Sequence, residues 1–364
     1  MKELSVLMKP ASSLCNLRCR YCFYADVSEN REQASLGVMK DETIDIVASR
    51  IREALEENGT ANISFQGGEP TVAGLEWFRK FAAAMDRYPD IRVNWSMQTN
   101  ATLLDEAFCA FLAERKFLVG VSLDGYQANH DHFRYDAKNK GAFYRVLHGI
   151  DLLKKAGVDY NILTVVTSDL SKHAKALYQF YVQHHFEYVQ LIPCLPGLDG
   201  EWDGLAIRPE EYEVFYKEFF ACWAEGFAKG VSLSVNLFEN LAGMLRGYPP
   251  YQCGMLGRCV VQYVIEGDGT VYPCDFYCLD EYCLGNLKDL GFEEMKQTQH
   301  ARDFLSGSDC RKTPCETCRY VRMCSGGCRR QNICYLKDDY CAYQKVLDEI
   351  LPVLDRILRQ YQEK

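Results

Sequence analysis

The sequence lacks a secretory signal, a membrane-spanning run and an excess of positive charge. It begins MKELSVLMKP, without an apolar segment and cleavage site, and no run approaches the length of a membrane span. Lys and Arg number 41 against 50 Asp and Glu, a net charge of −9. Nucleic-acid binding usually needs a basic face. We therefore expect a cytoplasmic protein with neither nucleic acid nor membrane as a partner.

Tandem repeats and low-complexity segments are also absent from the sequence. The 364 residues suffice for one large domain and a smaller one, and a hydrophobic content of 48% excludes general disorder. Cysteine, in contrast, is abundant, with 18 residues. Thiols stay reduced in the cytosol, where clustered cysteines more often bind metal than form disulfides.

Three of these cysteines, Cys15, Cys19 and Cys22, form a C-x3-C-x2-C motif. Three thiolates can hold three irons of a four-iron cluster and leave the fourth iron open for chemistry. The alternatives are ordinary buried cysteines or a zinc knuckle. Zinc sites usually add a second ligand pair, and none follows within the next hundred residues. The spacing therefore favours an iron–sulfur cluster with an open iron.

Strands and helices alternate through the first half of the chain. Apolar alternation and helical spacing predict strands and helices in turn, and five crossovers between six strands indicate a parallel sheet curled into a partial barrel. The predicted strands are 5–9, 61–65, 91–97, 117–123, 159–166 and 188–192, and the helices are 41–57, 74–88, 105–116, 143–156 and 171–184.

The pattern changes after Pro196. A long aromatic helix is predicted over 209–230, a strand over 231–236, a helix over 238–246, a hairpin turn at 267–269 and a closing helix over 346–362. We predict four parts: the barrel at 1–196, linker elements at 197–250, a cysteine-rich domain at 251–344 and the C-terminal helix at 345–364.

Eight cysteines in the C-terminal third make two complete four-cysteine shells: Cys253, Cys259, Cys274, Cys315, Cys318, Cys324, Cys328 and Cys341. A small region with so little apolar content needs a metal to fold. Zinc remains the alternative on spacing alone. Seven other cysteines are interpreted mainly as small core residues, with ligation left open for Cys278 and Cys283: Cys109, Cys194, Cys222, Cys278, Cys283, Cys310 and Cys334.

The N-terminal triad and the string GGEP at 67–70 resemble the radical S-adenosylmethionine (SAM) enzymes, and the C-terminal cysteine pattern resembles their SPASM extension. This resemblance implies a partial (β/α)6 TIM-like barrel, a small SPASM domain and a C-terminal helix. The strings YCFY, FQGGEPT, QTN, LVGVSLDG and VYPCDFY resemble the anaerobic sulfatase-maturating enzymes. Those enzymes oxidise a sulfatase Cys or Ser to formylglycine. Asn100-Ala101 departs from the family's usual Asn-Gly.

The resemblance implies SAM and three [4Fe-4S] clusters as cofactors. It assigns the first cluster to Cys15, Cys19 and Cys22. It gives the first auxiliary cluster the ligands Cys253, Cys259, Cys274 and Cys328, and the second Cys315, Cys318, Cys324 and Cys341. Its implied partners are a sulfatase polypeptide with a C/S-x-P/A-x-R motif and a flavodoxin- or ferredoxin-type electron donor.

By similarity, SAM contacts are Tyr21, Gly68, Ser122, Arg134 and Leu195, and substrate contacts are Tyr24, Gln66 and Gln98. Gly68, Ser122 and Leu195 follow predicted strands, at the end where barrel ligands bind. Arg134 has a surface salt bridge as its ordinary interpretation. Asp275 follows Cys274 and is the expected general base; the alternatives are a turn cap at Asp275 or Asp280 as the base.

Two other functions fit parts of the pattern. A radical maturase of a ribosomal peptide would form a thioether or carbon–carbon crosslink, but such enzymes often carry a leader-peptide domain, and only fourteen residues precede Cys15. A non-catalytic iron–sulfur or zinc protein would need neither the 66–70 loop nor Arg134.

Overall fold

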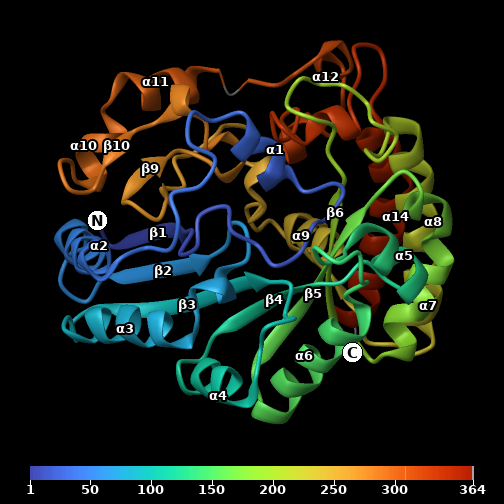
Figure 1. Cartoon of the computed structure of the whole chain (residues 1–364). Coiled ribbons are helices and arrows are strands. Elements are labelled where there is room, and N and C mark those ends of the chain that lie inside the picture. The colour runs from blue at the N-terminus through green and yellow to red at the C-terminus, as the bar shows by residue number, and fades with distance from the viewer. Residues whose placement is uncertain (308, 363–364) are drawn as a thin grey trace. The chain divides into compact units, whose positions relative to one another are not determined.

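The computed structural model describes residues 1–307 and 309–362, which form two compact units. The first unit comprises residues 1–123, 130–160 and 260–305, and the second comprises 124–129, 161–259 and 306–364. Figure 1 shows the course of the chain through these elements. The four-part division predicted from the sequence stays a prediction.

The first unit is built on a sheet with the strand order β10-β9-β8-β1-β2-β3-β4. Strands β1 to β4 are parallel neighbours. Their bounds are β1 Glu3–Met8, β2 Thr60–Phe65, β3 Arg92–Thr99 and β4 Leu118–Ser122. The helices between and after them are α1 Phe23–Glu29, α2 Asp41–Ala54, η1 Pro70–Ala73, α3 Leu75–Asp86, α4 Glu106–Glu114, α5 Gln127–Phe133 and α6 Phe143–Ala156.

The predicted hairpin at 267–269 is confirmed, and it extends this sheet. β8 (Val264–Ile265) pairs antiparallel with β9 (Thr270–Tyr272) and parallel with β1. The segment continues through η4 Asp275–Tyr277, η5 Asp280–Tyr282, β10 Gly285–Asn286, α10 Phe292–Lys296 and α11 Gln299–Ser306. The pairing of β8 with β1 brings the segment after Cys274 to the N-terminal cysteine loop.

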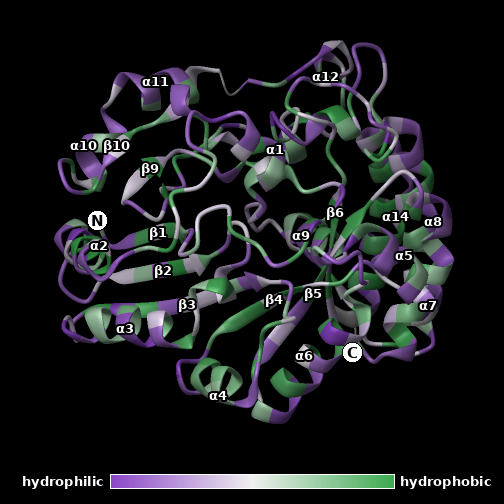
Figure 2. Cartoon of the chain, in the orientation of Figure 1, coloured by the Kyte–Doolittle hydropathy of each residue, from purple (hydrophilic) through white to green (hydrophobic). Residues whose placement is uncertain are grey.

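Strand β2 has one apolar and one polar face. On β2, Ile63 and Phe65 are fully buried. The ring centroid of Phe65 lies 5.1 Å from that of Phe78 on α3. Side chains alternate along a strand, so Ser64 points to the opposite face, where its Oγ lies 2.7 Å from Ser96 Oγ of β3. Figure 2 shows the mixed hydropathy of β2 and β3. This polar face leads to the functional residues at the strand ends.

The second unit contains the parallel strands β5 Asp159–Val166, β6 Tyr188–Pro193 and β7 Ser234–Val235. Aromatic residues of α8, including Phe215 and Phe219, are completely buried. The unit's helices are η2 Leu170–His173, α7 Ala174–Gln183, α8 Pro209–Ala228, α9 Asn236–Leu245, η3 Cys253–Met255, α12 Thr313–Glu316, α13 Val321–Cys324, η6 Asn332–Cys334 and α14 Ala342–Gln362.

Several predicted bounds differ from the structure. The strand predicted at 231–236 shortens to β7 at Ser234–Val235, and α9 already begins at Asn236. The helix predicted at 171–184 starts as the 3-10 turn η2 before α7. Among the described residues, no helix combines the length and apolar character needed to cross a membrane.

Candidate active site

The loop after β1 carries Cys15, Cys19 and Cys22, and backbone hydrogen bonds hold it in place. Arg18 N donates to Tyr135 O at 2.6 Å and Arg20 N donates to Phe133 O at 3.0 Å. Burial raises the pKa of the Cys15 thiol to about 11, and a charge on the nearby Cys22 adds to the rise. Cys22 then caps α1. The loop thus gathers its thiols on a short, anchored segment.

The Gly-Gly-Glu-Pro loop after β2 packs directly on this cysteine loop. Gly68 has a φ of +43°, and a Cβ there would lie 2.2 Å from Leu14 O. Only glycine fits so close an approach. The next residue, Glu69, donates its backbone N–H to Leu14 O at 2.8 Å. Its buried carboxylate accepts from Thr71 Oγ1 and Thr99 Oγ1, both at 2.6 Å, and from Asn100 N at 2.7 Å. Glu69 thereby ties the strand ends to the cysteine loop.

Arg134 lies beside the cysteine loop rather than on the surface. The residue is 8% exposed. Its Nη1 lies 4.0 Å from Cys19 Sγ, and its guanidinium lies 5.4 Å from the ring centroid of Tyr21. A buried guanidinium next to a cysteine loop can pair with a carboxylate. The structure therefore brings two of the expected SAM contacts together at the triad.

The expected contacts on the polar face also meet in pairs. Gln98 Nε2 donates to Ser122 Oγ at 3.0 Å. Tyr24 OH lies 3.1 Å from Gln66 Oε1 and 2.5 Å from Asp275 Oδ2. The fifth expected SAM contact, Leu195, follows β6 in the second unit, next to the buried Cys194.

The two carboxylate oxygens of Asp275 differ in their hydrogen bonding. Tyr24 OH donates to Oδ2, whereas Oδ1 is buried with no hydrogen-bond partner among the described residues. Burial raises the pKa of Asp275 to about 6, although the positive charge of Lys9 opposes the rise. A carboxylate with a bare oxygen and a pKa near neutrality suits proton abstraction. Asp280, the rival base, is exposed and accepts from Glu32 N at 2.8 Å.

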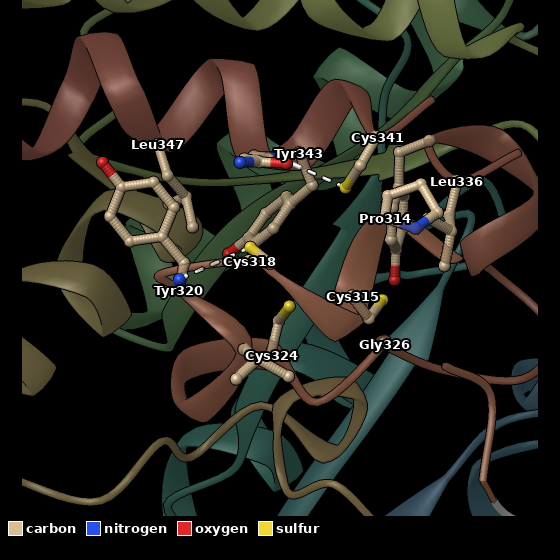
Figure 3. A pocket seen from close by; sticks show the side chains of 13 residues that line it. Pro314, Cys315, Cys318, Tyr320, Cys324, Gly326, Leu336, Cys341, Tyr343 and Leu347 are labelled. Carbon is tan, nitrogen blue, oxygen red and sulfur yellow. Dashed lines mark hydrogen bonds between the residues drawn. The ribbon is translucent and has the colours of Figure 1, made fainter. Parts of the chain in front are cut away.

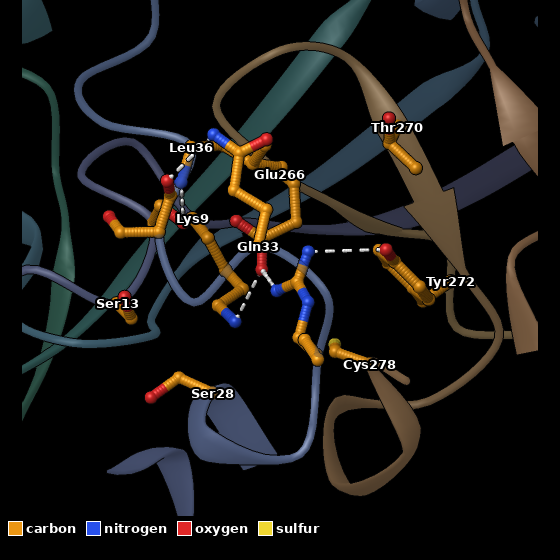
Figure 4. Close-up of polar contacts among 12 residues, drawn as sticks. Lys9, Ser13, Ser28, Gln33, Leu36, Glu266, Thr270, Tyr272 and Cys278 are labelled. Atoms are coloured by element: carbon orange, nitrogen blue, oxygen red, sulfur yellow. Dashed lines mark hydrogen bonds and ion pairs between the residues drawn. The ribbon is translucent and has the colours of Figure 1, made fainter. Parts of the chain in front are cut away.

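Lys9, Glu266 and Arg31 form a buried ion cluster, and the charges of Lys9 and Glu266 act on Asp275. Figure 4 shows Lys9 and Glu266 in this cluster. Lys9 Nζ and Arg31 Nη1 each lie 2.7 Å from Glu266 Oε1. Lys9 is 2% and Glu266 0% exposed, and Lys9 Nζ sits 5.3 Å from the Tyr24 ring centroid. This cluster joins β1 to the hairpin segment that carries Asp275.

Sequence reasoning missed this cluster. Its lysine and its carboxylate lie 257 positions apart, and no local pattern links them. The one available signal is Lys9 itself, a charged residue that ends a predicted strand. Buried charges are usually paired, so a partner could be expected but not named.

Four of the C-terminal cysteines line one small cavity in the second unit: Cys315, Cys318, Cys324 and Cys341. Figure 3 shows their sulfur atoms around this common space. Tyr343, whose side chain is buried, closes part of the wall. These are the four cysteines that the family resemblance assigns to the second auxiliary cluster.

A second set of thiols lies around the turn at Cys328. A Cβ at Gly254 would lie 3.2 Å from Cys328 Cβ, so the η3 turn with Cys253 packs on Cys328. Burial raises the pKa of Cys259, and the charge of Cys328 adds to it. Cys274, the fourth expected ligand, belongs to the first unit.

The remaining cysteines divide by burial. Cys109, Cys194, Cys278 and Cys334 are buried, as expected for core residues, whereas Cys222, Cys283 and Cys310 are partly exposed. Cys278 donates to Cys274 O at 3.6 Å.

Comparisons with protein families define the class. Residues 10–180 match the family model "Radical SAM superfamily", and residues 257–324 match the "Iron-sulfur cluster-binding domain" SPASM. The fold prediction, a TIM-like partial barrel with a SPASM domain, is thereby confirmed.

Individual relatives narrow the class to one family. The chain is 40% identical to a cysteine-type anaerobic sulfatase-maturating enzyme of Clostridium novyi, over 91% of this chain and 89% of the relative. It is 31% identical to a serine-type anaerobic sulfatase-maturating enzyme of Klebsiella aerogenes, over 89% of this chain and 79% of the relative. The structure of anSMEcpe with bound AdoMet and Cp18Cys peptide matches with a TM-score of 0.89 and 36% identity, over 99% of both chains. The chain belongs to the anaerobic sulfatase-maturating enzymes.

The protein is therefore a radical SAM oxidoreductase that forms formylglycine from a sulfatase Cys or Ser. It uses SAM, a [4Fe-4S] cluster of the radical SAM type and the additional clusters of the SPASM domain.

Proposed function

We propose that this enzyme oxidises a cysteine within a C-x-P-x-R segment of a sulfatase, with Asp275 as the general base. The higher identity to the cysteine-type relative, 40% against 31% for a serine-type one, supports cysteine as the target residue. The observation that carries the role of Asp275 is its buried, unpartnered Oδ1, close to the cysteine loop.

In this proposal the chain positions the reactants and moves one proton. When bound, SAM would supply the 5′-deoxyadenosyl radical for removal of a hydrogen atom from the substrate Cβ, and an iron–sulfur cluster would accept the electron left behind. Asp275 Oδ1 takes the proton of the substrate thiol. Tyr24 holds Oδ2, so the bare oxygen faces the substrate. The thioaldehyde that remains on the substrate is hydrolysed to the aldehyde.

The proposed first-cluster ligands are Cys15, Cys19 and Cys22, with Arg134 and Tyr21 placed to receive the carboxylate of SAM. Gly68, Ser122 and Leu195 are proposed as further SAM contacts, and Gln66 and Gln98 as substrate contacts. Support comes from the pairing of Arg134 with Cys19 and of Gln98 with Ser122.

The proposed auxiliary ligands fall into two sets of four. The first set is Cys253, Cys259, Cys274 and Cys328, and the second is Cys315, Cys318, Cys324 and Cys341. The shared cavity of the second set and the packing of η3 on Cys328 support the assignment. We further propose a cytoplasmic location, because thiols stay reduced in the cytosol. We also propose a flavodoxin- or ferredoxin-type electron donor, because iron–sulfur clusters exchange single electrons.

Asp275→Asn tests the base. The variant keeps nearly the shape of the aspartate but cannot accept the proton. Incubated without oxygen with SAM, a reductant and a C-x-P-x-R peptide, it should still cleave SAM, yet lose formylglycine by about a hundredfold or more. Asp280→Asn is the matched control and should keep full activity. Product formation by Asp275→Asn at the normal rate would contradict the assignment.

Substrate choice needs a separate measurement. The same peptide with serine in place of cysteine should be converted more slowly, and mass spectrometry identifies the aldehyde in either case. Faster conversion of the serine peptide would refute the cysteine preference without affecting Asp275.

A further inference from the structure

The loop that follows β6 carries Leu195 between two buried residues, Cys194 and Pro196. The strand itself ends at Pro193, so its ladder no longer fixes the loop. Leu195 is half-buried and precedes a proline, which restricts its backbone to extended conformations. Its exact position therefore depends on what holds the residues on either side of it.

Two side chains from the C-terminal part of the chain hold the carbonyl groups that flank Leu195. Arg330 Nη2 donates to Pro196 O at 2.5 Å, and Cys334 Sγ donates to Cys194 O at 3.4 Å. Both donors are buried, with Arg330 8% and Cys334 0% exposed. A hydrogen bond from a charged donor is stronger than one between neutral groups, and burial strengthens it further. The loop is thus fastened on both sides of Leu195.

The two donors belong to one hydrogen-bonded turn that begins at Cys328. Cys328 O accepts from Gln331 N at 3.1 Å and from Asn332 N at 2.8 Å. The 3-10 turn η6 follows and ends at Cys334. This turn and the loop after β6 both belong to the second unit. The loop is therefore attached to the same turn as a proposed ligand of the first auxiliary cluster.

We propose that Arg330 and Cys334 are positioning residues for SAM, which hold the loop after β6 so that Leu195 is already placed to contact the cofactor. The inference rests on the proposed function, in which Leu195 is a SAM contact. Binding to a loop that is already ordered avoids the entropy cost of ordering it. The two side chains therefore act on SAM affinity through Leu195 and need no contact of their own with SAM.

The first test measures the Kd for SAM of Arg330→Met by anaerobic equilibrium dialysis, with the iron content of the full chain matched to wild type. The Kd should rise about two- to tenfold, the cost of ordering a side chain on binding. The kcat at saturating SAM and the KM for a C-x-P-x-R peptide should stay unchanged. Amide hydrogen exchange of residues 190–207 should become faster in the SAM-free variant. Lys337→Met is the matched control, because it removes an exposed cation that pairs with Glu210 at 2.6 Å, and it should change none of these values.

A pair of variants at Cys334 decides the question if Arg330→Met fails to load iron. Cys334→Ser keeps a donor for Cys194 O and should bind SAM like wild type, whereas Cys334→Ala removes the donor and should raise the Kd. An unchanged Kd in Arg330→Met and Cys334→Ala, with a raised Kd in Leu195→Ala, would overturn the positioning role. An equal rise in the peptide KM would also overturn it, because that result indicates a general structural defect. An unchanged Kd in Leu195→Ala would instead overturn the proposed SAM contact.

Discussion

Removal of the Lys9 charge should destabilise the enzyme far more than removal of an equally close surface charge. Lys9→Met keeps the length and apolar stem of the side chain and deletes its ammonium group. The ammonium is 2.7 Å from Glu266 Oε1, and both residues are buried. Glu266 would then keep Arg31, also at 2.7 Å, as its cationic partner.

The size of the effect follows from what remains around Glu266. At an effective dielectric of about 20, two charges 2.7 Å apart attract by about 6 kcal/mol, offset by several kcal/mol of desolvation for each ion. Breaking a buried pair usually costs about 3–5 kcal/mol because the remaining charge is uncompensated. Arg31 still compensates Glu266, so we expect about 2–3 kcal/mol.

This loss can be measured as a change in melting temperature. With an unfolding entropy of about 2.1 cal/mol/K per residue, a chain of 364 residues has about 0.8 kcal/mol/K. A loss of about 2–3 kcal/mol then lowers Tm by about 3–4 °C. The assay is anaerobic calorimetry of the iron-loaded protein, with iron content measured in parallel.

Lys80→Met is the matched control. Lys80 Nζ also lies 2.7 Å from a carboxylate, Asp41 Oδ2, but both side chains are exposed. Exposed pairs contribute little because water and salt screen them, so Tm should stay within error. Equal Tm shifts for Lys9→Met and Lys80→Met would refute the reasoning from burial.

Three further perturbations have definite expected outcomes. Gly68→Ala should place a methyl group on Leu14 O, displace the cysteine loop and lose the iron of one cluster, as read by iron analysis; full iron content would contradict this. Lys9 and Arg31 lower the pKa of Glu266 despite its burial, so its contribution to stability is present above its ordinary pKa of 4.5 and is lost as pH falls through the lowered value. Glu266→Gln should therefore reduce the decrease of Tm as the pH is lowered into the acid range. An unchanged decrease would refute the idea that the ionised Glu266 carboxylate stabilises the fold. Cys318→Ala should change the electron paramagnetic resonance of the second auxiliary cluster alone, whereas a change confined to another cluster would refute its assignment.

The alternating elements could be predicted because each has its own local periodicity. The helix Phe143–Ala156 and the strand Asp159–Val166 have the predicted bounds. Two short helices, α1 and α5, went unpredicted. Each has seven residues, which is too short for a helical period to show, and in α1 only Val27 is buried. The positions of these two helices depend on the loops next to them in the chain.

The sequence identified the candidate site residues but not the contacts between them. Motif spacing located the cysteines, the Gly-Gly-Glu-Pro loop and Asp275. The contacts of Lys9 with Glu266 and of Tyr24 with Asp275 span more than 250 positions, and only the pairing of β8 with β1 creates them. The family resemblance favoured Asp275 over Asp280, but the sequence alone could not show the contact with Tyr24 that distinguishes the two residues in the structure.

Ala101 shows how a departure from a family pattern acquires a physical meaning. It occupies the position where the family resemblance leads us to expect glycine, and its φ is +57°. A left-handed conformation costs a residue with a Cβ about 1–2 kcal/mol. The preceding Asn100 N donates to Glu69 Oε2 at 2.7 Å, and Ala101 N donates to Thr99 Oγ1 at 3.0 Å. These bonds hold the turn, so its shape survives without glycine.

The general-base role that we propose for Asp275 depends on two opposed effects of the same surroundings. Burial raises the pKa of its carboxyl group, whereas the charge of Lys9 opposes that rise. Lys9 is itself kept charged in the interior by Glu266, which Arg31 also pairs. The ion cluster therefore keeps a cation near the proposed base without a hydrogen bond from that cation to Oδ1. A direct Lys9–Asp275 ion pair would occupy Oδ1, the oxygen that we propose to accept the substrate proton.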